Sequence, residues 1–200
     1  AQFIGANRPE EVVALSNASE ALNLAANTLG TRLGPRDEVV ITIMEHHSNL
    51  VPWQLVCERT GAKLRWFDIT DDGQLDLDKA EREGLINEHT KVVSLALASN
   101  VLGTINPVQR IAQWAHQVGA VVVVDASQAV PQMPVDVTEL GVDLLAFTGH
   151  KMLGPTGIGI LWGRYDLLDD LPPFLGGGEM IEVVHMTGST YAKPPHRFEA

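Results

Sequence analysis

Short apolar runs alternate along the chain with segments of helical periodicity. The apolar runs occupy residues 11–15, 38–44, 63–69, 91–98, 120–124, 142–147 and 158–162. Capping side chains at 16–20 precede the periodic residues 21–29, and further helices are predicted from Pro52 to about Thr60, Asp76 to about Glu88 and Pro107 to Val118. This alternation is typical of an α/β domain, and we expect three α/β/α layers around a mainly parallel sheet.

The run of four valines, Val121 to Val124, predicts the central strand. A continuous apolar run suits a strand that is covered on both faces. Asp125 follows directly. A carboxylate in that position is costly unless a cation lies nearby. A helix N-cap or a loop carboxylate is the plain alternative, and both interpretations stay open.

Polar side chains recur where the predicted strands end. Since ligands of such sheets collect beyond the carboxyl ends of the strands, we expect these residues to share one site. They are Ser19, His46, Asn100, Asp125, Gln128, Thr148, His150 and Lys151.

Lys151 lies in a glycine-bounded turn, residues 147–157, between two apolar runs. Lysine is almost never buried without a partner, so a surface lysine is the ordinary interpretation. An amine that forms a Schiff base with a carbonyl cofactor is the functional one. An aromatic aldehyde with a phosphate tail and a pyridine nitrogen would use Lys151 as its amine, Asp125 as the partner of the nitrogen and His46 as the stacking face.

The remaining polar residues suit the other groups of such a cofactor. Its phosphate would need N–H and hydroxyl donors, and its ring hydroxyl would need hydrogen-bond partners. Ser19 with its helix start, Thr148 and His150 are the candidates for the phosphate, and Asn100 and Gln128 are those for the hydroxyl. A plain N-cap is the alternative for the helix start around Ser19.

Composition narrows the class of protein. Two hundred residues predict one domain, and the net charge of −11 argues against nucleic-acid binding. No apolar stretch is long enough for a bilayer and no leader pattern opens the chain, so we expect a soluble, cytoplasmic protein without a membrane partner. The single cysteine, Cys57, excludes an internal disulfide and is interpreted as a small buried residue of a helix.

Other chemistries fit less well. His46 and His47 suggest a metal, but neighbouring strand residues point to opposite faces and no further His/Cys cluster exists, so no metal is expected. Gly154, Gly157 and Gly159 do not follow the order of a dinucleotide fingerprint, and no GK[ST] ends the run. A GxSxG elbow is absent as well.

Several strings together resemble the class V aminotransferases, which are pyridoxal-phosphate enzymes. Within that family they look most like the cysteine desulfurases of iron–sulfur cluster assembly, with selenocysteine lyases as close relatives. The strings cover nearly the whole chain in order: EHHSNLVPW (45–53), SNVLGT (99–104), VDASQAV (124–130), TGHKMLGPTGIGILW (148–162) and LGGGEMI (175–181).

The resemblance implies a fold-type I large domain over residues 1–200 and a homodimer. It implies that Lys151 binds pyridoxal phosphate and later moves protons, with His46 as the second catalytic residue, stacked on the ring. Asp125 would pair with the pyridine nitrogen, Gln128 and Asn100 would lie by the ring hydroxyl, and Ala18, Ser19, Thr148 and His150 would surround the phosphate. The loop 176–178 would approach the site of the neighbouring subunit; a flexible surface loop is its alternative.

Two departures from the family pattern affect these expectations. Relatives often carry two adjacent threonines in the phosphate turn, whereas this chain has Ala18-Ser19 and so lacks one hydroxyl. Relatives also deliver sulfur through a cysteine, and bind the substrate carboxylate with an arginine, in a C-terminal part that Cys57 does not match. Both ends, at Ala1 and Ala200, look like cuts through a longer protein, so we expect a domain that lacks an N-terminal segment and a C-terminal small domain.

The implied reaction converts L-cysteine to L-alanine and passes sulfur to an enzyme cysteine as a persulfide, for a sulfur-acceptor protein. Selenocysteine lyase activity, kynureninase-like cleavage or epimerisation on the same cofactor is the first alternative. A catalytically silent folding or dimerisation module is the second.

Overall fold

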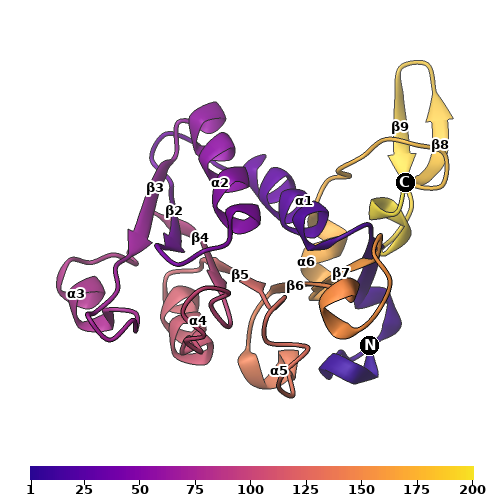
Figure 1. The fold of residues 1–200 in the computed structure, drawn as a ribbon. Coiled ribbons are helices and arrows are strands. Elements are labelled where there is room, and N and C mark those ends of the chain that lie inside the picture. Colours follow the sequence, from indigo (N-terminus) through magenta and orange to yellow (C-terminus); the bar gives the residue numbers. More distant parts are fainter.

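Seven strands form one sheet, in the order β1-β7-β6-β5-β4-β2-β3, in the computed structural model, which describes residues 1–200 (Figure 1). Strands β2 to β6 pair in parallel, and β7 is antiparallel to both β6 and β1. The predicted mainly parallel sheet is therefore confirmed. The strands are β1 (Val12–Leu15), β2 (Glu38–Thr42), β3 (Lys63–Phe67), β4 (Thr90–Ala96), β5 (Val121–Asp125), β6 (Leu144–Thr148) and β7 (Gly159–Gly163).

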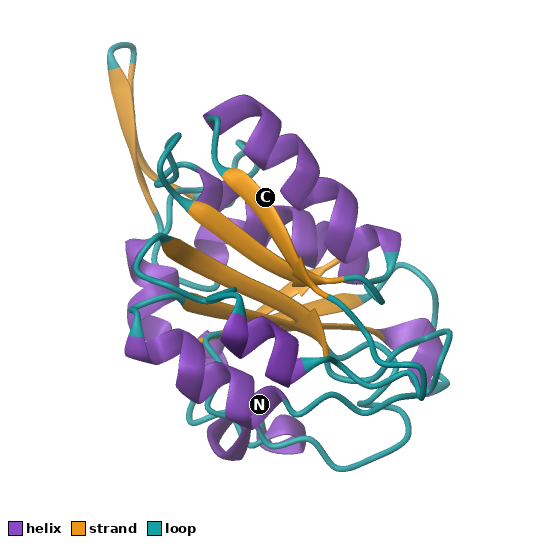
Figure 2. Ribbon diagram, turned by 90° about the vertical axis from the view of Figure 1, so that its left-hand side faces the viewer, coloured by secondary structure: helices purple, strands orange, loops and turns teal.

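Helices cover both faces of this sheet, which gives the expected three layers (Figures 1 and 2). One face carries α1 (Ala18–Gly30), α2 (His47–Thr60) and α6 (Tyr165–Asp170), and the other carries α3 (Leu77–Arg82), α4 (Val108–Gln117) and α5 (Val137–Leu140). Short 3-10 helices complete the fold: η1 (Gln2–Ile4), η2 (Pro9–Glu11), η3 (Gly149–Met152) and η4 (His196–Phe198).

The valine run of β5 packs into both hydrophobic layers. Val122 and Val124 belong to the core under α4 and α5, whereas Val123 belongs to the core under α1 and α2. All three are 0% exposed. Successive side chains of a strand point to opposite faces, so an uninterrupted apolar run is what a doubly covered strand requires.

Two predicted helices differ in extent from the observed ones. The segment expected to be helical from Asp76 to Glu88 ends at Arg82, because Gly84 adopts a φ of 55°, in the left-handed region that favours glycine. Helix α2 begins at His47, before Pro52, because the His46 side chain accepts the Ser48 N–H and caps its first turn.

A two-stranded hairpin, β8 (Ile181–His185) and β9 (Gly188–Tyr191), projects away from the sheet (Figures 1 and 2). The apolar pattern did not predict it, because its residues are mostly exposed and alternate weakly. The glycine loop 176–178 leads into this hairpin. None of the helices combines the length and the apolar character needed to cross a bilayer.

Candidate functional site

The carboxyl ends of β1, β2, β5 and β6 meet around one polar cavity of about 150 Å³. All but one of the residues that line it are polar: Asn17, Ala18, Ser19, His46, Ser48, Asp125, Thr148, His150 and Lys151. The structure thus brings together seven of the nine residues that the sequence singled out. As expected, residues that follow different strands lie together at one edge of the sheet, although Ala18 and Lys151 are far apart in sequence.

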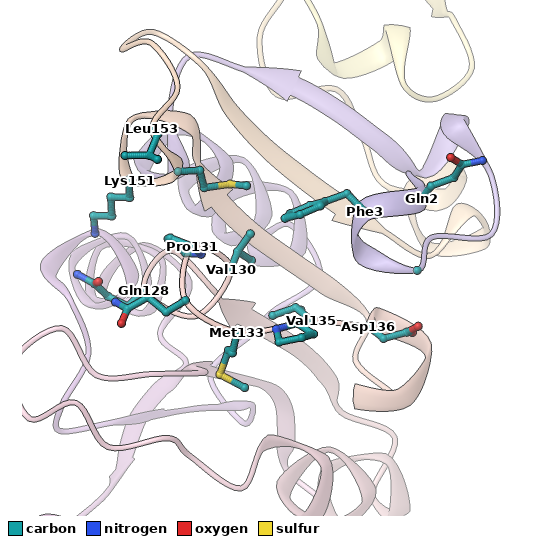
Figure 3. Close-up of a pocket in the computed structure, with 14 residues that line it drawn as sticks. Gln2, Phe3, Gln128, Val130, Pro131, Met133, Val135, Asp136, Lys151 and Leu153 are labelled. Carbon is teal, nitrogen blue, oxygen red and sulfur yellow. The ribbon is translucent and has the colours of Figure 1, made fainter.

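The other two predicted residues lie outside this cavity. Asn100 is exposed and lines a neighbouring cavity of about 490 Å³, together with Gln128. Gln128 and Lys151 both line a third, larger cavity of about 1030 Å³. Figure 3 shows that the Lys151 side chain extends toward the region of Gln128. Lys151 lines both the polar cavity and this larger one, and it therefore lies where the two cavities meet.

Lys151 lies in η3, the short helix that directly follows β6. It is half-buried, and the lysine ion pairs of the chain are formed by Lys79 and Lys193 instead. The next turn is closed by a hydrogen bond from Gly154 N–H to Gly149 O of 3.0 Å, and Leu153 takes a φ of 60°. A bulky residue in that conformation is strained, and such strain is often found at functional sites.

Asp125 is the last residue of β5 and is only 7% exposed. Its Oδ1 accepts the Ser127 N–H at 2.9 Å, while Oδ2 has no hydrogen-bond partner in the chain. No helix begins at Asp125, so the N-cap interpretation is wrong. A buried carboxylate with a free oxygen that faces a polar cavity calls for a cationic or N–H partner in that cavity.

The first turn of α1 supplies N–H donors at the opposite part of the cavity. Asn17 caps this helix, with its Oδ1 accepting the Glu20 N–H at 2.9 Å. The N–H groups of Ala18 and Ser19 donate to no acceptor in the chain. Free N–H groups and the positive end of the helix dipole make such a turn favourable for an anion.

Imidazole and hydroxyl groups complete the lining. His46 Nδ1 accepts the Ser48 N–H at 3.1 Å, which places the proton of the neutral ring on Nε2. Thr148, which is buried, has its Oγ1 3.0 Å from His150 Nδ1. His46 and His47 stand at the start of α2 rather than in a strand, so the strand-based argument against a shared metal does not apply to them.

A buried polar network lies directly behind the cavity. Glu45 accepts hydrogen bonds from Thr42 Oγ1, Asn49 Nδ2 and Ala96 N–H at 2.5, 2.7 and 3.0 Å. Burial raises the pKa of the Glu45 carboxyl to about 7, the negative charge of Asp125 adds to that rise, and the three donors oppose it. Because Thr42 is the last residue of β2 and Ala96 the last residue of β4, this carboxyl ties the ends of the two strands together.

Sequence reasoning missed three residues of this region: Asn17 and Ser48 in the lining, and Glu45 behind it. All three stand within two residues of a predicted site residue. Proximity in sequence was therefore a usable signal. The contact of Ser48 with Ser19 depends on the packing of α1 against α2, and that of Glu45 with Ala96 depends on the pairing of β2 with β4, neither of which the pattern alone gives.

Comparison with known proteins places the chain in a family. The sheet order, with a lysine after β6 and an acid at the end of β5, defines an α/β domain that has a polar site at one edge of its sheet. The family model described as aminotransferase class-V matches residues 1–200. The chain belongs to the class V aminotransferase family, a family of pyridoxal-phosphate enzymes. The sequence resemblance is thereby confirmed.

The relatives within that family are cysteine desulfurases. The chain is 62% identical to a probable cysteine desulfurase of Streptomyces coelicolor, covering 100% of this chain and 49% of the relative. It is 50% identical to a cysteine desulfurase of Haloferax volcanii, covering 100% of this chain and 47% of that relative. The chain thus spans about half the length of the relatives it matches.

Solved structures agree with this result. The cysteine desulfurase CsdA of Escherichia coli superposes with a TM-score of 0.96 at 38% identity, covering 100% of this chain and 50% of that one. The apo cysteine desulfurase of Thermococcus onnurineus superposes with a TM-score of 0.92 at 44% identity, covering 100% of this chain and 49% of that one.

Proposed function

We propose that residues 1–200 form the pyridoxal-phosphate-binding domain of a cysteine desulfurase. The observation that carries the proposal is the meeting of Lys151, the unpaired Oδ2 of Asp125 and the free N–H groups of α1 in one polar cavity. The similarity to cysteine desulfurases along the whole chain supports the same assignment. The cofactor, the roles of individual residues and the reaction are all part of this proposal.

The donor set fits the cofactor group by group. Two N–H groups at the start of α1, the hydroxyls of Ser19 and Thr148 and the His150 imidazole suit a phosphate monoester. The buried Asp125 carboxylate suits a protonated ring nitrogen, and the half-buried Lys151 amine suits an aldehyde. Gln128 and Asn100 are the proposed partners of the ring hydroxyl, since both line one cavity and Gln128 also lines a second cavity together with Lys151.

When bound, pyridoxal phosphate supplies an electron sink for the bonds at the substrate Cα. The protein's own groups make that sink effective. Asp125 would hold a proton on the ring nitrogen, because its charge is buried and its Oδ2 has no other partner in the chain. His46 provides a flat face, and its Nδ1 is held by the Ser48 N–H so that the ring keeps one orientation.

Lys151 Nζ is the proposed carrier of the proton that moves to and from the substrate Cα. Its place in the short turn between β6 and β7 restricts the backbone, while its long side chain reaches into the cavity. Cys57 is not the proposed sulfur carrier. It is buried in α2, and burial raises the pKa of its thiol to about 11, which suppresses the reactive thiolate.

The proposed reaction converts L-cysteine to L-alanine, with sulfur passed to a cysteine in the part of the protein outside residues 1–200. A homodimer, a sulfur-acceptor protein and a cytoplasmic location belong to the same proposal. The dimer would bring the loop 176–178 and the projecting hairpin toward a neighbouring subunit.

The test is a product assay on the whole protein. Purified protein is incubated with pyridoxal phosphate, L-cysteine and a thiol reductant, and alanine and sulfide are both quantified. We expect the two products in equal amounts, and neither from the Lys151→Ala variant. Alanine formed from L-selenocysteine but not from L-cysteine would instead assign a lyase, and no product from either amino acid would refute the proposed reaction.

A further inference from the structure

Ser48 places a hydroxyl in the proposed phosphate end of the cavity that the sequence patterns did not reveal. It stands in the first turn of α2, is half-buried and lines the cavity. Its Oγ lies 2.6 Å from the Oγ of Ser19, which stands in the first turn of α1. Ser19 and Ser48 are 29 residues apart in the sequence, so the first turns of α1 and α2 meet at this point.

The hydroxyl of Ser48 is not needed to orient the neighbouring imidazole. Its Oγ lies 3.0 Å from His46 Nδ1, but the backbone N–H of Ser48 already donates to the same nitrogen at 3.1 Å. A hydroxyl hydrogen rotates about its C–O bond without moving a heavy atom. Ser48 is thus able to turn its O–H toward the cavity while His46 keeps its orientation.

The position next to Ser19 lacks a hydroxyl of its own. Ala18 lines the cavity and contributes only a methyl group and its free N–H. Without Ser48, the first turn of α1 would offer a phosphate one hydroxyl and two N–H groups. With Ser48 the same anion meets two hydroxyls 2.6 Å apart, which suits two oxygens or one shared oxygen of a phosphate monoester.

We propose that Ser48 is a phosphate ligand of the cofactor site and replaces, from α2, the hydroxyl that Ala18 does not provide. This inference rests on the proposed function. It predicts a specific signature, since a phosphate ligand affects binding of pyridoxal phosphate but not of pyridoxal, which has the same ring and aldehyde without the phosphate. A residue that acted only through His46 would affect both compounds.

The experiment titrates the apoprotein with each compound and follows the visible absorbance of the bound aldehyde. For Ser48→Ala we expect the dissociation constant of pyridoxal phosphate to rise roughly tenfold, as the loss of one hydrogen bond to a charged group implies. The value for pyridoxal should stay within about twofold. Inorganic phosphate, used as a competitor against pyridoxal phosphate, should inhibit the variant less effectively than the wild type.

Three further variants serve as controls. Ser48→Thr keeps a hydroxyl and should bind like the wild type, and Ala18→Ser in the Ser48→Ala background should restore affinity by returning a hydroxyl to α1. Ser189→Ala, in the projecting hairpin, removes a serine hydroxyl outside the cavity and should change neither constant. Circular dichroism verifies that each variant is folded.

The outcomes separate this inference from the proposed function. If Ser48→Ala weakens the binding of pyridoxal phosphate and pyridoxal equally, or changes the binding of neither, the proposed role of Ser48 is overturned while the cofactor assignment stays in place. A folded wild-type protein that binds neither compound would instead refute the cofactor assignment, and the role of Ser48 with it.

Discussion

Replacing Gly159 by alanine should damage the phosphate end of the cavity and lower stability together. Gly159 is the first residue of β7 and pairs with Leu15 of β1 on one side and Thr148 of β6 on the other. A Cβ at this position would lie 2.2 Å from the carbonyl carbon of Asn17. Nonbonded carbon atoms normally stay about 3.5–4.0 Å apart, so the two backbone segments would have to separate by more than about 1 Å.

The cost follows from what has to move. Overpacking a well-packed site costs about 1–3 kcal/mol, and the upper end applies because the clash is with backbone rather than with a flexible side chain. Displacing Asn17 also weakens the cap of α1, which is worth about 1 kcal/mol. We therefore expect Gly159→Ala to lower the free energy of unfolding by about 3 kcal/mol and to weaken binding of pyridoxal phosphate.

Urea denaturation followed by far-UV circular dichroism measures the first effect, and cofactor titration measures the second. Gly34→Ala is the matched control, because a Cβ there would meet only Asp37 Oδ2, at 3.8 Å, and the residue has no positive φ. An unfolding free energy of Gly159→Ala within about 0.5 kcal/mol of the wild type would refute the reasoning. The close approach of β7 to the start of α1 would then not be a constraint of the fold.

Three other changes give distinct expected results. Burial raises the pKa of Glu45 from its ordinary 4.5 to about 7. Its contribution to the free energy of unfolding is therefore complete below about pH 4.5 and is lost as the pH rises through 7, by on the order of 3 kcal/mol. Urea unfolding across this pH range should show the loss of stability, and Glu45→Gln should make the stability nearly independent of pH there. Asp125→Ala should reduce turnover of the whole protein roughly 10²–10³-fold while much of the cofactor binding remains, and unchanged turnover would contradict the role of its charge. Asp143 is buried, accepts the Val122 N–H at 2.7 Å, and lies 2.9 Å from both His116 and Arg164, so Asp143→Ala should cost roughly 2–3 kcal/mol of stability. Because this cluster lies at the amino ends of β5 and β6, the affinity for the cofactor should not change. A large loss of affinity would contradict the separation of this cluster from the site.

The layered fold and most of the cavity lining were predictable from local patterns. A doubly covered strand leaves a continuous apolar run, as at Val121–Val124, and parallel strands bring their following residues to one edge. That rule predicted that Asp125, Thr148 and Lys151 would lie close together, and they line one cavity. The orientation of β7, antiparallel to its neighbours, was not expected, because an apolar run does not encode strand direction.

What the patterns missed depends on contacts between segments distant in sequence. The hydroxyl pair of Ser19 and Ser48 exists because α1 packs against α2, and neither serine differs locally from an ordinary helix-start residue. Glu45 looks like a loop carboxylate, yet packing buries it against Ala96 of the adjacent strand. The hairpin β8–β9 has little apolar alternation because it packs on no core, so a periodicity argument has nothing to detect.

The central claim is that Lys151 is the amine that binds the cofactor aldehyde, and covalent trapping tests it most directly. The folded protein is mixed with pyridoxal phosphate, reduced with borohydride, digested and sequenced by mass spectrometry. The account predicts one predominant cofactor adduct on the peptide that contains Lys151, and none at that site in Lys151→Ala. An adduct spread over exposed lysines such as Lys63 and Lys193, with the Lys151 peptide unmodified, would contradict it.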